Sequence, residues 1–406
     1  MVIWTVSWRN VWRNKLRSLV IFTAIAIGVF ASVFTTAFMQ GMSDQRIESA
    51  IKTEISFIQL HNPKFEEAQD INALINKIDE KKKKISEIPN VSGQSERIVI
   101  NGMAASAETS SGVRLYGINT EDEFKVTNIN EKLIEGEFFD GIKRNPVVIG
   151  HKLADKLNLK LRSKIIFTFQ DYEGNLTGGA FKIAGIYKTS NSMFDESTIF
   201  VRKSDLQRLT MIPENSAHEI VVNLDNQEFD KMVKTKIVEL FLDTKTKLWT
   251  ELKPELALFN EVMGMYMYIF VGIILFALGF GIVNTMLMVV LERVKEIGML
   301  LAVGMNRMRV FKMIVLETVF LSLTGGFVGI VLGGLVSQYY SVNPIDLSIW
   351  SAGLSKIGWS SLVNTSISFE SLIGITLMVI ITGILAAIYP ARKALKLNPA
   401  DALRTE

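Results

Sequence analysis

The sequence predicts a membrane protein with four transmembrane helices and a large mixed α/β domain of two lobes outside the cytoplasm. Four apolar stretches are long enough to cross a bilayer, basic residues gather on one side of them, and segment 42–265 alternates between helix and strand patterns. The composition agrees, because 49% of the residues are hydrophobic and the mean hydropathy is +0.27, although 21% are charged. The apolar residues must therefore be concentrated in blocks.

Transmembrane helices are predicted at 19–41, 266–291, 313–339 and 371–390. A helix needs roughly 20 mainly apolar residues to cross about 30 Å of hydrocarbon, and each stretch meets this length. The first stretch follows a basic start, as in a signal peptide, but its apolar run exceeds the usual length of about 7 to 15 residues. We therefore expect an uncleaved anchor.

One charged residue, Glu317, lies within these stretches. It is near the start of the third predicted helix, where a carboxylate is costly unless it is paired or reaches the surface. We predict an ion pair with Arg309 or Lys312, just before it in the chain. A proton-relay role is the alternative, but such a role would call for further acidic residues inside the membrane.

The distribution of lysine and arginine predicts the orientation. Segments 1–18, 292–312 and 391–406 together hold 13 basic and four acidic residues, whereas segment 42–265 holds 30 basic and 34 acidic residues, and segment 340–370 holds one and two. Cytoplasmic segments near membrane ends carry an excess of Lys and Arg. We therefore predict a cytoplasmic amphipathic helix at 1–18, a cytoplasmic loop at 292–312 and a cytoplasmic C-terminus at 391–406, with 42–265 and 340–370 outside.

Several classes of function are excluded. The chain has no cysteine, and its three histidines, His61, His151 and His218, are far apart in the sequence, which excludes thiolate chemistry and disfavours a metal cluster. The patterns G-x-x-x-x-G-K-[ST], G-x-S-x-G and H-E-x-x-H do not occur, and the glycines of 174–179 follow a strand pattern without opening a helix. We expect a non-catalytic chain with no metal, no cofactor of its own and no nucleic-acid partner, since the basic residues have a membrane-surface explanation.

Segment 42–265 predicts a mixed α/β domain. Its periodicities predict helices at 66–88, 151–157 and 228–241 and strands at 97–100, 113–118, 146–149, 164–169, 181–187, 197–201, 219–224 and 247–250. Lys81–Lys84 in the first helix are interpreted as a solvated face rather than a lipid site. The order of elements predicts a discontinuous lobe at about 42–118 and 196–255, with a second lobe inserted at about 119–195.

Small residues recur every four positions in three of the predicted membrane helices. They are Ala24, Gly28 and Ser32, then Gly325, Gly329 and Gly333, and then Gly383, Ala387 and Ala391. Such spacing lets helices approach closely in lipid, where no hydrophobic drive favours association. Packing within one four-helix unit is the simpler interpretation, and a self-association face is the alternative.

A candidate substrate site lies at the outer ends of the first two membrane helices. It comprises Phe38, Met39, Met42, Met263, Met265 and Met267. Methionine is unbranched and adaptable, so a cluster suits variable apolar ligands such as acyl chains. The alternative is ordinary packing within an aromatic belt, because Tyr266, Tyr268 and Phe270 lie beside it.

The 292–312 loop is predicted to form a short amphipathic helix at the inner membrane surface. Glu292 and Glu296 are four residues apart, with Arg293 and Lys295 beside them, so a charged face is available for a soluble partner. Ile297, Leu300 and Leu301 form the apolar side.

Three sequence motifs occur in order: 8–17 (WRNVWRNKLR), 292–298 (ERVKEIG) and 389–404 (YPARKALKLNPADALR). Together they resemble the MacB/FtsX family of ABC transporter permeases. In the external domain, 115–118 (LYGI) and 147–154 (VVIGHKLA) are similar to permeases of the lipoprotein-releasing (Lol) complex. A separate permease with an external domain of this size resembles that complex more than the macrolide exporter, which has a fused ATPase, or the short cell-division permease.

The resemblance implies a dimeric permease, homomeric or heteromeric, with a MacB-like periplasmic core. It implies that ATPase subunits, which bind ATP and Mg, dock on the loop carrying Glu292, Arg293, Glu296 and Gly298. The expected activity is release of lipoproteins from a bacterial inner membrane to a periplasmic carrier, whose binding hairpin the sequence does not locate. The alternatives are efflux of small molecules or peptides and force transmission to a cell-wall hydrolase without transport.

Overall fold

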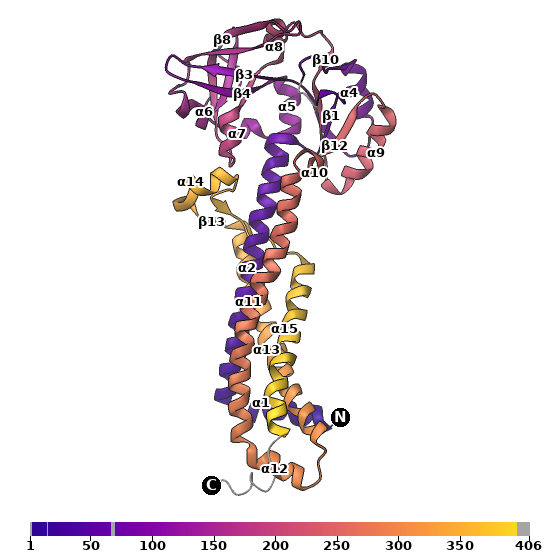
Figure 1. Ribbon diagram of the computed structural model, residues 1–406, viewed down its shortest axis with the longest axis vertical. Coiled ribbons are helices and arrows are strands. Elements are labelled where there is room, and N and C mark those ends of the chain that lie inside the picture. Colours follow the sequence, from indigo (N-terminus) through magenta and orange to yellow (C-terminus); the bar gives the residue numbers. More distant parts are fainter. Residues whose placement is uncertain (1, 14, 66–69, 396–406) are drawn as a thin grey trace. The chain divides into compact units, whose positions relative to one another are not determined.

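The computed structural model describes residues 2–13, 15–65 and 70–395, which form two compact units. The helical unit comprises the chain up to residue 44, residues 260–346 and the chain from residue 362 onward; the α/β unit comprises residues 45–259 and 347–361. Figure 1 traces both units. The C-terminal motif predicted to be cytoplasmic is described only as far as residue 395, and the rest of it lies outside the described residues.

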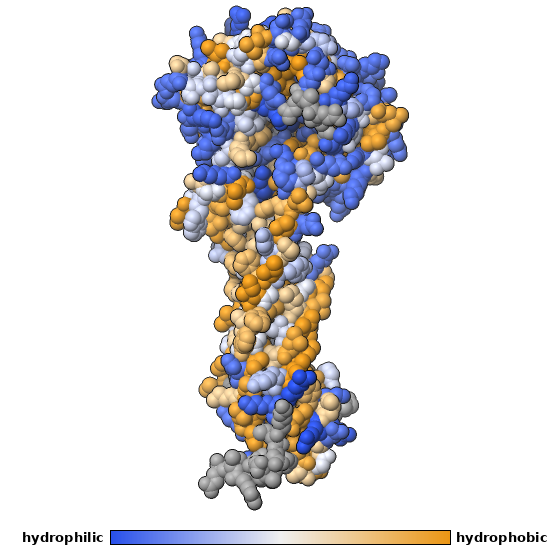
Figure 2. Space-filling model, viewed as in Figure 1, coloured by the Kyte–Doolittle hydropathy of each residue, from blue (hydrophilic) through white to orange (hydrophobic). Residues whose placement is uncertain are grey.

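Within the described residues, four helices are long and apolar enough to cross a membrane. They are α2 (Lys15–Ala50), α11 (Pro254–Glu292), α13 (Arg307–Val342) and α15 (Phe369–Leu395), and each contains one of the predicted spans. Two further helices, α1 (Val2–Arg13) and α12 (Val294–Ala302), lie before the first span and between the second and third. On the face shown in Figure 2, hydrophobic residues cover most of the long helices.

The small-residue stripes are used in packing within the chain. A methyl group added to Gly329 of α13 would lie 2.6 Å from the carbonyl oxygen of Ala26 on α2, and one added to Gly333 would lie 2.8 Å from Cβ of Val33. On α15, a methyl group on Gly383 would meet Oγ of Ser322 at 2.4 Å. Only glycine permits these approaches, so intramolecular packing is confirmed for these contacts.

The α/β unit is built on one ten-stranded mixed sheet. Along one path its strands are β12 (Lys245–Leu248), β1 (Ile58–His61), β11 (Glu219–Leu224), β3 (Val91–Ala105), β4 (Ser110–Ile118), β9 (Thr198–Arg202), β6 (Pro146–Gly150), β8 (Leu176–Tyr187) and β5 (Leu133–Gly136), while β7 (Lys164–Gln170) pairs with β3 and β8. The helices that accompany the sheet are α4 (Ile78–Ser86), α5 (Thr120–Val126), α6 (His151–Lys156), α7 (Ser192–Ser197), α8 (Lys203–Thr210), α9 (Asp230–Leu240) and α10 (Trp249–Leu252). Most predicted strands fall within these bounds.

The two largest hydrophobic cores of this unit lie on different parts of the sheet, and β3 contributes to both. Residues 91–97 of β3 pair with β11, whose core includes α4 and α9, whereas residues 98–105 pair with β4 and β7 in the other core. The predicted lobe boundary after residue 118 therefore differs from the distribution of the cores, because a single 15-residue strand is long enough to serve both. Periodicity reports which face of a strand is buried and not which core it faces.

The helix predicted at 66–88 is shorter than expected. Residues 66–69 lie outside the described residues, β2 (Ile75–Asn76) pairs with β10 (Ser216–Ala217), and α4 begins only at Ile78. Lys77 has φ +56°, in the left-handed region, and this backbone conformation separates β2 from α4. Likewise, segment 340–370 is more than a loop: β13 (Ile345–Asp346) pairs with β14 (Leu362–Val363), and α14 (Ser351–Leu354) lies between them.

Candidate functional site

A chain of ion pairs links α1, α12 and α13 in the helical unit. Nη1 of Arg293 lies 3.2 Å from both carboxylate oxygens of Glu317, and its Nε donates to Glu296 at 3.0 Å. The other oxygen of Glu296 accepts a hydrogen bond from Arg13. Arg13 and Glu296 are 283 positions apart in the sequence, and Arg293 and Glu317 are 24 apart. The bond between Arg293 and Glu296 joins these two pairs.

The geometry follows from where the helices end. α11 ends at Glu292, and Arg293 adopts a non-helical conformation before α12 begins, which turns its side chain toward α13. Burial opposes the charge of Arg293, but Glu317 and Glu296 outweigh it and raise the pKa of the guanidinium. Burial also works against the ionised Glu296, yet its bonds from Arg13 and Arg293 lower the pKa of that carboxyl. Both shifts keep Arg293 and Glu296 charged at neutral pH.

Glu317 is paired, but the predicted partners were wrong. Arg309 and Lys312 precede it by eight and five residues, spacings that do not place side chains side by side on a helix, and both are exposed. Glu317 is only 4% exposed, and its carboxylate instead pairs with Arg293, which lies between α11 and α12. A single acidic residue inside an apolar span indicates that the residue is paired, but it does not identify a partner 24 residues away.

Helix α1 packs along α13. Ser7 Oγ donates to the carbonyl oxygen of Met313 at 3.2 Å, and the rings of Trp4 and Trp8 meet the edge or face of Phe320 at centroid distances of 5.6 and 5.5 Å. The N-terminal helix is therefore attached to the third span by packing as well as through Arg13. The sequence predicted an amphipathic helix here but not this attachment.

The four predicted coupling residues have different surroundings. Glu292 is exposed, Arg293 and Glu296 are half-buried in the ion-pair chain, and Gly298 is buried with Ile297. The outward surface of α12 carries Lys295 and Met299, which are exposed. This surface offers a partner both charged and apolar side chains.

The predicted substrate cluster lies on two neighbouring helices. Ser43 Oγ of α2 donates to Asn260 Oδ1 of α11 at 3.0 Å. Ser43 directly follows Met42, and Asn260 is three residues before Met263. Phe38, Met39 and Met42 are half-buried on α2, and Met265 on α11 is 55% exposed. The structure thus brings together the two sequence-distant halves, which run side by side in Figure 1.

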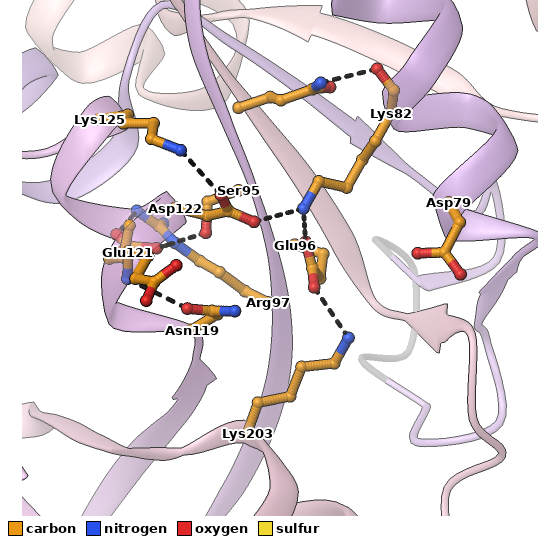
Figure 3. A network of polar contacts seen from close by, with 12 residues as sticks. Asp79, Lys82, Ser95, Glu96, Arg97, Asn119, Glu121, Asp122, Lys125 and Lys203 are labelled. Carbon is orange, nitrogen blue, oxygen red and sulfur yellow. Dashed lines mark hydrogen bonds and ion pairs between the residues drawn. The ribbon is translucent and has the colours of Figure 1, made fainter.

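A second polar network lies in the α/β unit (Figure 3). Lys82 of α4 bonds to Glu96 of β3 and, at 2.5 Å, to Asp122 of α5, while Lys203 of α8 reaches Glu96 at 3.1 Å. Burial opposes the charge of Lys82, but these carboxylates raise its pKa, and Lys82 in turn lowers the pKa of Asp122 despite partial burial. Lys82 is therefore a cross-link between elements and not part of a solvated face.

Lys81 also departs from the predicted solvated face, because it is 8% exposed and bonds to Asp243 at 2.7 Å. Lys83 and Lys84, by contrast, are exposed as expected. At the centre of the unit, Arg97 bonds to Glu123 at 2.5 and 3.0 Å. The guanidinium is 2% exposed and the carboxylate is fully buried, so this pair is structural.

Two family models match the chain. The MacB-like periplasmic core domain matches residues 18–240, and the FtsX-like permease C-terminal model matches residues 268–399. The first model covers more than half of the chain, and the second covers the 292–312 segment and most of the last three spans. The second model is that of a permease, the non-catalytic transmembrane component of an ABC transporter.

Curated relatives include an uncharacterized ABC transporter permease of Methanocaldococcus jannaschii, 28% identical over 67% of this chain and 65% of the relative. The macrolide export protein MacB of Rhodopirellula baltica is 35% identical over 33% of this chain and 17% of its own length. The chain thus spans less than two thirds of either of these relatives. LolC, the lipoprotein-releasing system transmembrane protein of Neisseria meningitidis, is 24% identical over 75% of this chain and 76% of the relative.

Solved structures with similarity include the extracellular domain of the transporter YknZ from Gram-positive bacteria, at 18% identity and a TM-score of 0.34, covering 47% of this chain and 98% of that domain. The periplasmic region of MacB from Actinobacillus actinomycetemcomitans gives 14% identity and a TM-score of 0.36, covering 52% and 98%. The match of the periplasmic core model and the permease model, in the expected order, carries the assignment. This chain, a multi-pass membrane protein with a large extracytoplasmic domain, belongs to the MacB/FtsX family of ABC transporter permeases.

Proposed function

We propose that the chain is the membrane subunit of an ATP-driven machine and that a separate ATPase docks on α12. The observation that carries this proposal is the ion-pair chain from Arg13 through Glu296 and Arg293 to Glu317. It connects the surface helix α12 to α1 and α13, so a displacement of α12 by a docked ATPase is transmitted to the spans. Glu292 and Lys295 supply exposed charges beside it for the docking contact.

Affinity purification of the tagged full chain in mild detergent, with mass spectrometry, tests the docking proposal. Glu292→Lys reverses the charge on the proposed surface and is expected to remove most of the co-purified ATPase. Glu370→Lys is the matched control, because Glu370 is equally exposed at the start of α15, at the other end of the spans. Equal retention of the ATPase by both variants would contradict docking at α12.

We further propose that the substrate is a lipoprotein, released from the outer leaflet of a bacterial inner membrane and handed to a carrier. The similarity to LolC along three quarters of both chains supports this, as do the methionines on α2 and α11, whose flexible side chains suit acyl chains. The working complex would contain a second permease subunit, either identical or related. Efflux of small molecules or peptides is the second candidate, favoured by the match of the MacB-like core.

ATP-dependent release of a fluorescent triacylated lipoprotein from reconstituted vesicles tests the substrate proposal. Replacing Met263, Met265 and Met267 by Asp is expected to stop release while the ATPase still co-purifies. The same three positions changed to Leu keep an apolar surface and are expected to retain most of the release. Unchanged release by the Asp variant would contradict this site, and co-purification of an adaptor and an outer-membrane channel would favour efflux.

A further inference from the structure

The α/β unit contains a cavity of about 640 Å³ that the coupling proposal does not use. Its walls come from residues 45–53, which begin in the last turns of α2, from Asn128 and Lys132, the start of α6, residues 188–190 after β8, and the segment 351–361. The volume lies in the range of about 300 to 1,000 Å³ that is usual for small-ligand sites. The walls therefore enclose enough space for a ligand.

The side chains around this cavity carry a positive excess. Lys52, Lys132, Lys152 and Lys188 line it together with one acidic residue, Glu48, which already pairs with Lys52. Among the residues that the structure describes, no carboxylate lies within 4 Å of the ammonium groups of the other three lysines. Segment 42–265 as a whole holds more acidic than basic residues, so this excess is local.

Two of these lysines are held directly opposite each other. Leu133 of β5 pairs with Tyr187 of β8, and the next backbone bond runs from Lys188 N to Lys132 O at 2.9 Å. Both lysines line the cavity, so two like charges share one space, where they repel each other. An anion bound between them would remove that repulsion.

A histidine is oriented at the same wall. Nδ1 of His151 lies 2.9 Å from Oδ2 of Asp195, whose fully buried carboxylate also accepts from Thr189 N at 3.0 Å and from Thr189 Oγ1 at 2.7 Å. Asp195 can approach the start of α6 this closely only because residue 150 is glycine, since a methyl group there would lie 2.1 Å from the carbonyl oxygen of Asp195. Because Nδ1 lies beside the buried carboxylate of Asp195, the opposite ring nitrogen, Nε2, is the one that a ligand in the cavity can reach.

We propose that this cavity binds a phosphate group, held by Lys132, Lys188 and His151. Charged donors and hydroxyls are the groups that bind phosphate oxygens in proteins, and Ser49 and Ser190 add hydroxyls to the same wall. The phosphate is either that of a phospholipid headgroup or free in solution. A headgroup is compatible with the walls at 45–53 and 351–361, because residues 45–50 form the end of α2 and residues 351–361 belong to the segment that connects α13 to α15.

A second cavity in the same unit provides the contrast. Its volume is about 950 Å³, and its walls carry Glu54 and Glu219 as well as Arg114 and Lys247. Carboxylates and cations are mixed there, so the walls favour no single sign of ligand charge. The positive excess is thus a property of the first cavity and not of cavities in this unit generally.

Calorimetric titration of the purified full chain in a non-ionic detergent tests the proposal, which is independent of ATP-driven transport. The probes are inorganic phosphate, dihexanoylphosphatidylglycerol and, as the phosphate-free analogue, dihexanoylglycerol. K132Q/K188Q is expected to weaken phosphate-dependent binding about tenfold or more, because two charged donors are lost. K231Q/K236Q removes the same charge from α9, outside the cavity walls, and is expected to leave affinity within about twofold.

Saturable binding of both phosphate probes, weakened only by K132Q/K188Q, supports a site for phosphate from either source. Binding of the lipid analogue alone, with the same variant response, supports a headgroup site. No saturable binding of either phosphate probe would overturn the proposal. Equal weakening by the α9 variant would also overturn it, as would equal affinity for dihexanoylglycerol, because neither result requires this cavity to recognise phosphate.

Discussion

In the helical unit, α13 approaches α2 through glycines, whereas the α/β unit encloses a buried ion pair. Gly329 leaves no room for a methyl group beside Ala26, and Arg97 and Glu123 are almost completely withdrawn from solvent. Apolar contacts between helices gain little in lipid, so closeness of fit decides which faces pair. In water, apolar burial already drives folding, and buried charges must then be satisfied by specific partners. Steric changes should therefore disrupt the helical unit, and loss of a charged partner should disrupt the α/β unit.

The largest expected effect is from removing one member of the buried pair. Arg97→Met leaves two buried carboxylates without this cation: Glu123, which keeps Ser95 and Thr127 as hydrogen-bond donors, and Glu219, whose Oε1 lies 3.5 Å from Arg97 Nη1. Such a loss typically costs about 3 to 5 kcal/mol. Pulse proteolysis of the full chain in detergent, with urea, is expected to show the α/β unit cleaved at markedly lower urea concentration.

The double variant Arg97→Met with Glu123→Met sharpens this test. The second change removes the carboxylate that makes the shorter bonds to Arg97 but leaves Glu219 in place, so part of the lost stability is expected to return. A double variant as unstable as the single one would show that shape at this position, and not charge, limits stability. That result would contradict the claim that loss of a charged partner is what disrupts the α/β unit.

The next effect concerns pH and His218. Its Nδ1 accepts from Val99 N at 3.1 Å and Nε2 lies 3.0 Å from the carbonyl oxygen of Ile71, an arrangement that fits the neutral ring. Burial, the main cause, together with His61, lowers the pKa of His218 from 6.5 to about 4, although the Ile71 carbonyl opposes the shift. Between these pH values the unfolded chain binds the proton and the folded chain does not, so stability falls as the pH is lowered.

The full contribution is about 3 kcal/mol, present above pH 6.5 and lost as the pH falls toward 4. The protection factor of the Val99 amide in the full chain, which is the intrinsic exchange rate at each pH divided by the observed rate, is expected to fall over this range. His218→Gln removes the titrating group and is expected to flatten that pH dependence, whereas His151→Gln leaves it in place. An unchanged dependence in His218→Gln would assign the effect to other groups.

Much of the fold was accessible from the sequence, because the predicted spans and strands rest on local periodicity. Long-range pairing was not accessible in this way. The partner of Glu317 is Arg293, in a different element, and β3 serves two cores because its two halves meet different strands. His151 was noted only as one of three scattered histidines, since its proximity to Asp195 depends on the close packing at Gly150. Contacts of this kind are set by tertiary structure, which no single-segment pattern encodes.

Adding one methyl group at Gly329 tests whether close packing stabilises the helical unit. Gly329→Ala places it 2.6 Å from the carbonyl oxygen of Ala26, so the backbones of α13 and α2 must separate, at a cost of about 1 to 3 kcal/mol. Gly334→Ala is the control on the same helix, because an added methyl there meets nothing within 4 Å. Thermal unfolding in detergent is expected to show a loss only for Gly329→Ala. Equal behaviour of the two variants would contradict close packing as the stabilising factor.

The smallest effect on stability is expected from the exposed end of the ion-pair chain. The side chains of Arg13 and Glu296 are 58% and 37% exposed, and pairs of this kind contribute at most about 1 kcal/mol. Arg13→Gln should therefore leave the thermal unfolding of the chain almost unchanged. Under the proposed docking, however, the same change frees one carboxylate oxygen of Glu296 and loosens α12 from α1.

Arg13→Gln can therefore change the transmission of movement without changing the stability of the chain. Stimulation of the ATPase by the reconstituted permease is expected to change in Arg13→Gln, and added salt should have the same effect on the wild-type chain because it screens an exposed pair. The buried bond between Arg293 and Glu317 should resist that salt, since it lies away from the solvent ions. If Arg13→Gln alters neither stability nor ATPase stimulation, the link from α12 to α1 does not transmit movement. Transmission would then have to run through Arg293 and Glu317 to α13 alone.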